Sequence, residues 1–276
     1  MVIRAGYEMI FELPQPVAMQ LLLKFHPSRL ADVSEERRAI ESNGKPLATC
    51  EYSDPFGNQC ERILAPVGRL RLWADATVAD SGEPDKEIHG LVQHPVEELP
   101  PEVMQFLLSS RYCEVDKLSP IAWELFGNTA PGAARVQAVC DWVNSHVTFG
   151  YHHARWTKSA LDVYIERAGV CRDFTHLALT FCRCLNIPAR YTTGYLGDIS
   201  VPPSGNPMDF SGWFEVFLDG QWRTMDARHN KRRIGRILMA TGRDAADVAL
   251  TTSFGSAPLV SFRVWTDELK NDGVKE

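Results

Sequence analysis

The sequence predicts an α+β protein in which a β-rich segment precedes a domain whose helices come before its strands. Three observations predict this class. Alternating apolar and polar residues dominate about the first 80 positions, helical spacing dominates residues 119–185, and strand-like runs return from Ala189 onward. Because the helices and strands are segregated along the chain, an antiparallel sheet is expected instead of alternating βαβ units.

Residues 1–98 are predicted to form an antiparallel β-sandwich-like domain. Their clearest strand is the alternating run RLRLWADATVAD, and turn signals stand at DPFGN (54–58) and at Val67-Gly68. Between Asp80 and Pro101, prolines and carboxylates interrupt every periodic pattern. This stretch predicts a boundary, so that residues 99–276 form the second domain.

The second domain should begin with helices. Ser119 followed by Pro120 indicates a helix start, and apolar residues repeat at helical spacing from Val136 to Val147. Ser159 can cap a helix that continues to about Ala168, where Gly169 breaks it. A further apolar stripe begins at Cys171 and ends near Leu185, before Pro188.

Strands follow these helices, with ARYTTGYL, GWFEVFL and QWRTMDA as the clearest candidates. Asp219-Gly220 is a typical two-residue hairpin loop, and it would pair Trp213 with Asp226 and Ser211 with Arg228. The apolar runs at 234–238 and 259–264 are expected to add strands to this second domain.

The composition argues against several classes of protein. Lys and Arg total 29, Asp and Glu total 35, and no basic run could follow a phosphate backbone, so a nucleic-acid partner is not expected. No run approaches about 18 apolar residues, and the charged N-terminal segment does not resemble a signal peptide, so no membrane association is expected. Seven irregularly spaced cysteines suggest reduced thiols and a cytoplasmic location.

Cys171 is the residue most directly linked to chemistry. Unpaired amides and the dipole at a helix N-terminus lower the pKa of a thiol, and the same amides could hold an oxyanion. The alternative is that Cys171 is a small buried residue on the same apolar stripe as Phe174. A metal site is not expected here, because Cys182 shares the helix face with Cys171 but lies about 16 Å away along the axis.

Several ordered blocks around this cysteine carry a more specific signal. They are AGVCRDFTHL (168–177), LNIPARY (185–191), GYL (194–196), TKSA (157–160), WFEV (213–216), MD (225–226) and GRD (242–244). Together they closely resemble the bacterial transglutaminase-like proteins, a family with proposed cysteine proteases among its members. The DPFGN turn also resembles the β domain that precedes the catalytic core in this group, so the resemblance covers nearly the whole chain.

The resemblance implies a papain-like core in which a cysteine, a histidine and an aspartate act on amide bonds without a metal or an organic cofactor. By position, Cys171 corresponds to the nucleophile and Asp226 to the residue that orients the base. The substrate would then be a peptide or a protein. The sequence does not indicate the oligomeric state.

The sequence departs from the family at the base. The family has a histidine two residues before the first hairpin tryptophan, whereas this chain has Ser211 before Trp213. A serine hydroxyl cannot shuttle a proton near neutral pH, and that transfer is typically worth about 10²–10⁴-fold in rate. The predicted hairpin makes Ser211 and Asp226 diagonal neighbours on one face, with Cα atoms about 7–8 Å apart.

Other histidines are weaker candidates for the base. His229 would lie on the opposite face from Asp226 unless the strand ends or bulges before it. His152 and His153 could approach from another loop, although a solvated turn is the simpler interpretation. His176 lies about 140° around the helix from Cys171, which favours a packing role.

Two functions are therefore expected. In the first, the protein is a thiol enzyme that hydrolyses or transfers acyl groups from peptide or glutamine amides through a thioester at Cys171. In the alternative, it is a pseudoenzyme that keeps the fold, binds a peptide or a partner protein, and does not turn over.

Overall fold

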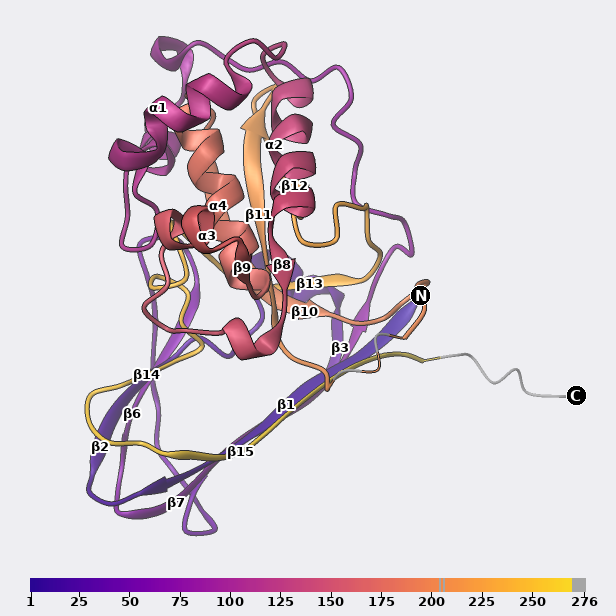
Figure 1. Ribbon diagram of the computed structural model, residues 1–276. Coiled ribbons are helices and arrows are strands. Elements are labelled where there is room, and N and C mark those ends of the chain that lie inside the picture. The colour runs from indigo at the N-terminus through magenta and orange to yellow at the C-terminus, as the bar shows by residue number, and fades with distance from the viewer. Residues whose placement is uncertain (204, 206, 270–276) are drawn as a thin grey trace, which may run out of the picture.

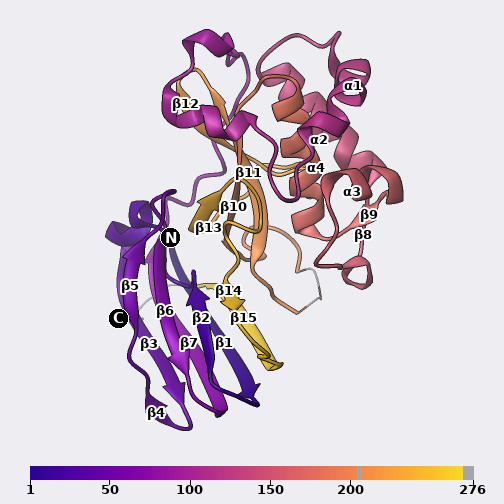
Figure 2. The same ribbon diagram turned by 90° about the vertical axis from the view of Figure 1, so that its left-hand side faces the viewer.

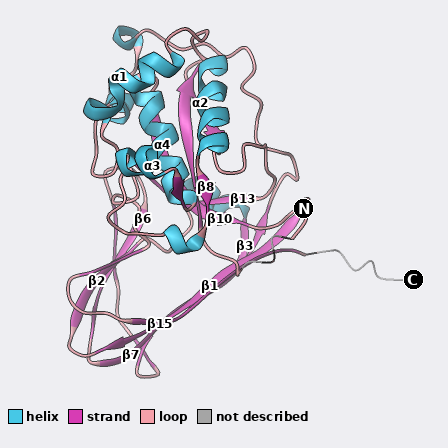
Figure 3. Ribbon diagram, in the orientation of Figure 1, coloured by secondary structure: helices cyan, strands magenta, loops and turns pink. Residues whose placement is uncertain are grey.

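A computed structural model describes residues 1–203, 205 and 207–269 of the chain. The protein is a mixed α/β structure with a β sandwich at one end and the helices gathered at the other (Figures 1 and 3). A four-stranded sheet lies between these two parts (Figure 2). Within the described residues, no helix combines the length and the apolar character needed to cross a membrane.

Two antiparallel sheets form the sandwich. The first has the order β15-β1-β7-β3-β4 and the second has the order β14-β2-β6-β5. Their strands are β1 (Val2–Leu13), β2 (Val17–Leu21), β3 (Val33–Ser42), β4 (Lys45–Pro46), β5 (Cys50–Ser53), β6 (Gln59–Ala65), β7 (Gly68–Ala79), β14 (Thr251–Ser253) and β15 (Leu259–Glu268). A 3₁₀ helix, η1 (Pro27–Asp32), precedes β3.

Alternation along the strands accounts for the core of the sandwich. Leu70, Leu72 and Val78 of β7 are fully buried and contribute to one apolar cluster with residues of the second sheet such as Met19 and Leu21. The turn between β5 and β6 begins at Asp54, as the sequence predicts, and its carboxylate accepts hydrogen bonds from the backbone of the turn.

The end of the chain differs from the prediction. Residues 259–264 do not extend the second domain, because β15 pairs with β1 and β14 pairs with β2. The last strands therefore pair with the strands of the N-terminal sandwich. Residues 236–238 of the run at 234–238 do enter the sheet of the second domain, as the first part of β13.

The second domain is built around one central helix. The helices are α1 (Val115–Phe126), α2 (Ala133–His146), α3 (Ala160–Glu166) and α4 (Cys171–Cys184), and α4 packs against the other three and against the sheet. The sheet has the order β12-β11-β10-β13, made of β10 (Ala189–Leu196), β11 (Ser211–Leu218), β12 (Gln221–Met225) and β13 (Arg236–Gly242). The short pieces are β8 (Thr148–Phe149), β9 (Ala168–Gly169), η2 (Val96–Glu98), η3 (Pro101–Leu107) and η4 (Tyr151–His153).

This sheet is covered on both faces. Phe214, Val216 and Leu218 belong to the apolar cluster that surrounds α4, whereas Ile237 and Met239 belong to the cluster of the β sandwich. Burial on both faces holds the sheet firmly in place. The cluster around α4 and the cluster of the sandwich together hold the place where the first turn of α4 meets β11.

Helix boundaries follow the sequence signals, with one exception. Ser159 caps α3 through a capping box with Asp162, and the stripe that begins at Cys171 forms α4. The helix α1, however, begins at Val115, so Ser119 and Pro120 lie inside it. Pro120 is the sixth residue of α1, so the lack of its N–H removes one helical hydrogen bond.

The β11–β12 hairpin has the predicted register. Asp219 and Gly220 adopt positive φ angles of 47° and 70°, as a type I′ turn requires, and the ladder runs from Leu218↔Gln221 to Phe214↔Met225. The strand β12 ends at Met225, one residue before Asp226. The backbone after this point is therefore free to turn.

Candidate functional site

Cys171 is the first residue of α4. Asp173 stabilises this helix start, because its Oδ2 atom accepts a hydrogen bond from the Val170 N–H at 2.9 Å. Gly169 allows the close approach, since a Cβ atom there would lie only 2.7 Å from Asp173 Oδ2. Arg172 donates to the same carboxylate and to the Arg155 carbonyl, so its guanidinium is held by partners within the protein.

Cys171 is partly exposed as a residue, in contrast to the five buried cysteines of the chain. Burial nevertheless raises the pKa of Cys171, and the nearby backbone groups of Gly212 and Arg172 and the positive charge of Arg228 lower it only in part. The helix start does provide the expected donor through Arg172. The sequence prediction of a lowered pKa is wrong because desolvation outweighs that contribution.

Charged residues that the sequence interpretation did not identify surround this thiol. The negative charge of Asp209 raises the pKa of Cys171, and burial raises the pKa of Asp209 itself. The guanidinium of Arg228 lies 3.8 Å from the ring centroid of Phe149, beside η4. Asp209 and Arg228 come from segments that flank the β11–β12 hairpin, so their convergence depends on the register of the hairpin.

Asp226 is buried and fully engaged. Its Oδ1 atom accepts the N–H groups of Arg228 and His229 at 3.0 Å each, and its Oδ2 atom lies 2.9 Å from Arg236 Nη2. Burial alone would raise the pKa of this carboxyl. The hydrogen bond from His229 and the charge of Arg236 reverse that effect and hold the pKa of Asp226 well below its usual range.

His229 is brought to Asp226 by the turn after β12. Its Nδ1 atom lies 2.9 Å from Asp226 Oδ2, because the strand ends before this residue and alternation no longer applies. Ser211 is buried and begins β11, opposite Gly194 of β10. In the described part of the chain, no imidazole nitrogen is within hydrogen-bonding distance of the Cys171 sulfur.

The remaining histidines have other surroundings. His176 is buried, accepts a hydrogen bond from the Ala245 N–H at 3.1 Å and stacks on Tyr112, and burial lowers its pKa well below the usual value. This agrees with the expected packing role. His152 is exposed and His153 partly buried on η4, whose preceding Gly150 donates to the Gly169 carbonyl near Cys171.

Comparison with known proteins fits this arrangement. Residues 121–227 match the sequence model of the Transglutaminase-like superfamily. A solved structure from Cytophaga hutchinsonii, named a "Putative Cysteine Protease", has 30% sequence identity and a TM-score of 0.84, with 99% of this chain and 92% of that chain covered. The chain belongs to the bacterial transglutaminase-like family.

Two further proteins show some similarity to this chain. An uncharacterised protein of Mycobacterium leprae is 32% identical over 124 residues, which are 41% of this chain and only 42% of that protein. The periplasmic domain of TgpA from Pseudomonas aeruginosa shares 17% identity at a TM-score of 0.40, over 82% of this chain and 90% of that chain.

The region that matches the transglutaminase-like superfamily includes Cys171, Ser211 and Asp226 and ends just before Arg228 and His229. The GRD block also has a structural role in this transglutaminase-like protein. Asp244 accepts the Tyr112 N–H at 2.8 Å, and the neighbouring Ala245 binds His176. The block therefore fixes the rings that pack behind the first turn of α4.

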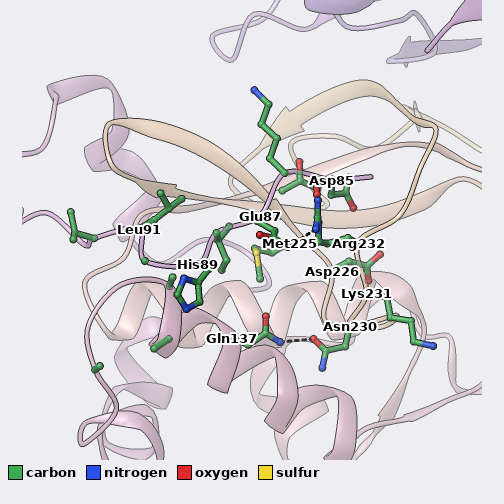
Figure 4. Close-up of a pocket in the computed structure, with 18 of the residues that line it drawn as sticks. Asp85, Glu87, His89, Leu91, Gln137, Met225, Asp226, Asn230, Lys231 and Arg232 are labelled. Atoms are coloured by element: carbon green, nitrogen blue, oxygen red, sulfur yellow. Dashed lines mark hydrogen bonds and ion pairs between the residues drawn. The ribbon is translucent and has the colours of Figure 1, made fainter. Parts of the chain in front are cut away.

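A cavity of about 870 Å³ lies on another side of Asp226, between residues 85–92, the N-terminal part of α2 and the turn at 230–232 (Figure 4). Gln137 and Asn230 are joined by a 3.0 Å hydrogen bond at its wall. Cys171 does not line this cavity, so it is separate from the thiol. No cluster of three or more His, Cys, Asp or Glu side chains suited to a metal ion occurs in the described residues.

Proposed function

We propose that this protein is a thiol enzyme that acts on peptide or glutamine amide bonds through a thioester at Cys171. The observation that carries the proposal is a partly exposed cysteine at the first residue of α4, within the matched transglutaminase-like region. Backbone N–H groups at that helix start provide donors for a developing negative charge. Ser211 stands where the family has its catalytic histidine, so we expect a low rate.

The proposed reaction has two stages. The sulfur of Cys171 bonds to the amide carbonyl carbon, the C–N bond breaks, and the amine leaves with the proton that the thiol supplied. Water or a second amine then attacks the thioester, the S–C bond breaks and the thiol regains a proton. The first acceptor gives hydrolysis and the second gives acyl transfer.

Asp226 is the proposed orienting carboxylate, and His229 is the proposed substitute base. Their 2.9 Å contact supports this pairing. With no contact between an imidazole and the sulfur among the described residues, a proton would have to pass from Cys171 to His229 through solvent or after a shift of the turn at 227–229.

The second candidate is a pseudoenzyme that binds a peptide or a partner protein. Two observations favour it: the pKa of Cys171 is raised by burial, and Ser211 provides no base. A protein that keeps this fold without an activated thiol would still be able to bind a peptide or a partner protein. Neither candidate calls for nucleic acid or membrane as a partner, and the seven unpaired cysteines support the cytoplasmic location that we propose.

A trapping experiment separates the two candidates. The protein is incubated with a glutamine-containing peptide and hydroxylamine, which captures an acyl-enzyme as a hydroxamate. We expect hydroxamate from the wild type and none from Cys171→Ala, with Cys50→Ala unchanged because Cys50 lies in the β sandwich. Peptide binding to the wild type without hydroxamate would support the pseudoenzyme and overturn the proposal.

A further inference from the structure

The guanidinium of Arg228 is a charged group to which neither the family resemblance nor the proposed triad gives a role. Arg228 is partly exposed and lies one residue beyond the region that matches the superfamily. Its guanidinium carbon lies over the ring of Phe149, 3.8 Å from the ring centroid. No carboxylate of the described residues lies within ion-pairing distance of this guanidinium, and none of their atoms accepts a hydrogen bond from it. Its donors are therefore available to a ligand.

The ring of Phe149 places this guanidinium beside the start of α4. Phe149 pairs with Gly169 where β8 and β9 run side by side, two residues before Cys171 (Figure 1). The same ring packs on Phe174, three residues after Cys171, with ring centroids 6.4 Å apart. Arg228 is thus stacked on a ring that contacts the chain on both sides of the nucleophile. Its positive charge also lowers the pKa of Cys171, as a neighbouring cation does.

The backbone of Arg228 is fixed from two sides. Its N–H donates to Asp226 Oδ1 at 3.0 Å, and its carbonyl accepts a hydrogen bond from Asn144 Nδ2 of α2 at 2.7 Å. Stacking on Phe149 restrains the other end of the side chain. A cation that is already restrained at both ends loses little further freedom when it binds a ligand, which favours affinity.

Asp209 carries the opposite charge in this region but does not occupy the guanidinium. Burial raises the pKa of Asp209, and the positive charge of Arg228 lowers that pKa only in part. Within the part of the chain that the structure describes, the two side chains form no ion pair. The negative charge of Asp209 also acts on Cys171, so an anionic ligand is favoured on the Arg228 side of the thiol.

A carboxylate is the ligand group that suits these donors. The planar guanidinium can donate two parallel N–H···O bonds to the two oxygens of a carboxylate, which an ammonium group cannot do. A peptide offers carboxylates in its aspartate and glutamate side chains and at its C-terminus. The substrate that the proposed reaction requires therefore already contains a suitable group.

We propose that Arg228 is a specificity-determining residue that binds a carboxylate of the peptide beside the amide that Cys171 attacks. The substrate class is then acidic peptides, in which a carboxylate flanks the reactive glutamine or peptide bond. This inference rests on the proposed function, since it takes Cys171 as the nucleophile. Arg228 forms no covalent bond in the reaction and acts on substrate binding.

Matched peptides test the proposal through hydroxamate formation. Two pairs of acetylated and amidated glutamine peptides are compared, in which the residue before or after the glutamine is either aspartate or asparagine. We expect kcat/KM to be about ten-fold higher for the aspartate peptide of at least one pair, through a lower KM. The ratio within a pair is compared because a change in the ionisation of Cys171 affects both of its peptides equally.

Variants at position 228 should change this ratio. In Arg228→Gln it should fall to about one, whereas Arg228→Lys should keep part of the preference because the ammonium keeps the charge without the planar donors. Arg167→Gln is the matched control. The Arg167 guanidinium also stacks on rings, those of Trp142 and Tyr164 at 4.5 Å each, and has no carboxylate partner among the described residues. Its loss should leave the ratio unchanged.

Peptide binding to Cys171→Ala tests the inference without turnover. The aspartate peptide of the preferred pair should bind about ten-fold more tightly than its asparagine partner at low salt, and this preference should shrink as salt is added. The salt series needs no substitution at position 228. Equal use and binding of the two peptides of each pair, or a preference that survives in folded Arg228→Gln, would overturn the inference. Absence of Cys171-dependent hydroxamate from every peptide would instead overturn the proposed function, so the two failures are distinguishable.

Discussion

His229 Nδ1 lies 2.9 Å from Oδ2 of Asp226. The imidazole of His229 comes from the turn after the β11–β12 hairpin. The family instead has its histidine at the start of β11, where this chain has Ser211. The carboxylate therefore retains an imidazole partner, but one attached to a different part of the backbone. Restoring the family's residue should restore a base without altering the rest of the site.

We expect Ser211→His to raise hydroxamate formation by about 10²-fold, the lower end of the usual contribution of general-base catalysis. The hairpin register supports this, because continuing it past Phe214↔Met225 makes position 211 a diagonal neighbour of Asp226. Ser211→Asn is the matched control, with similar bulk and no base near neutral pH. A folded Ser211→His protein with unchanged activity would show that the proposed site geometry is wrong.

The alkylation profile of Cys171 should reflect its raised pKa. Because burial outweighs the donors around the sulfur, the midpoint should lie above the ordinary thiol value of about 8.5. The rate should then rise about ten-fold per pH unit below that midpoint. A midpoint below about 7 would mean that the donors at the helix start outweigh burial, which would contradict this expectation.

The ionised form of Asp226 should contribute stability that depends on pH. Its pKa is lower in the folded protein than in the unfolded chain, so the contribution is complete above the unfolded value of about 3.9 and is lost as the pH falls toward the folded value. We expect Asp226→Asn to cost about 3 kcal/mol at pH 7 and less at pH 3.5. Urea unfolding at both pH values measures this, and an equal cost at both would refute it.

Arg236 should be a stronger determinant of stability than exposed arginines. Its side chain is 7% exposed and bridges Asp226 and Asp85, each at 2.9 Å. Arg236→Met would remove the cation shared by the buried Asp226 and the partly buried Asp85, which should cost about 3–5 kcal/mol in the free energy of unfolding. Arg263, which is 69% exposed and paired with Glu8, is the control, and Arg263→Met should cost at most about 1 kcal/mol. Similar costs for both variants would contradict this account.

Local signals in the sequence predicted the local structure well. The Ser159 cap, the start of α4 at Cys171 and the Asp219-Gly220 hairpin all appear as expected, because each depends on residues a few positions apart. The family resemblance is confirmed over the matched region. The helix start predicted at Ser119-Pro120 is wrong, because α1 packs on α4 and begins earlier, at Val115. A local signal does not report such packing.

Relations between distant segments could not be read from the sequence. The strand β15 pairs with β1 across more than 240 positions, and an alternating strand gives no indication of which sheet it joins. The placement of Asp209 and Arg228 near Cys171 depends on the register of the β11–β12 hairpin in the same way. The raised pKa of Cys171 results from burial by the whole fold, whereas the helix signal reports only its own first turn.

Acyl-enzyme formation is the most direct test of the central claim that Cys171 is the nucleophile. Intact-protein mass spectrometry after incubation with a glutamine-containing peptide should reveal an adduct that maps to Cys171, is removed by hydroxylamine and is absent from Cys171→Ala. A folded wild-type protein that gives no adduct across pH 6–9, or an adduct that persists in Cys171→Ala, would contradict the claim.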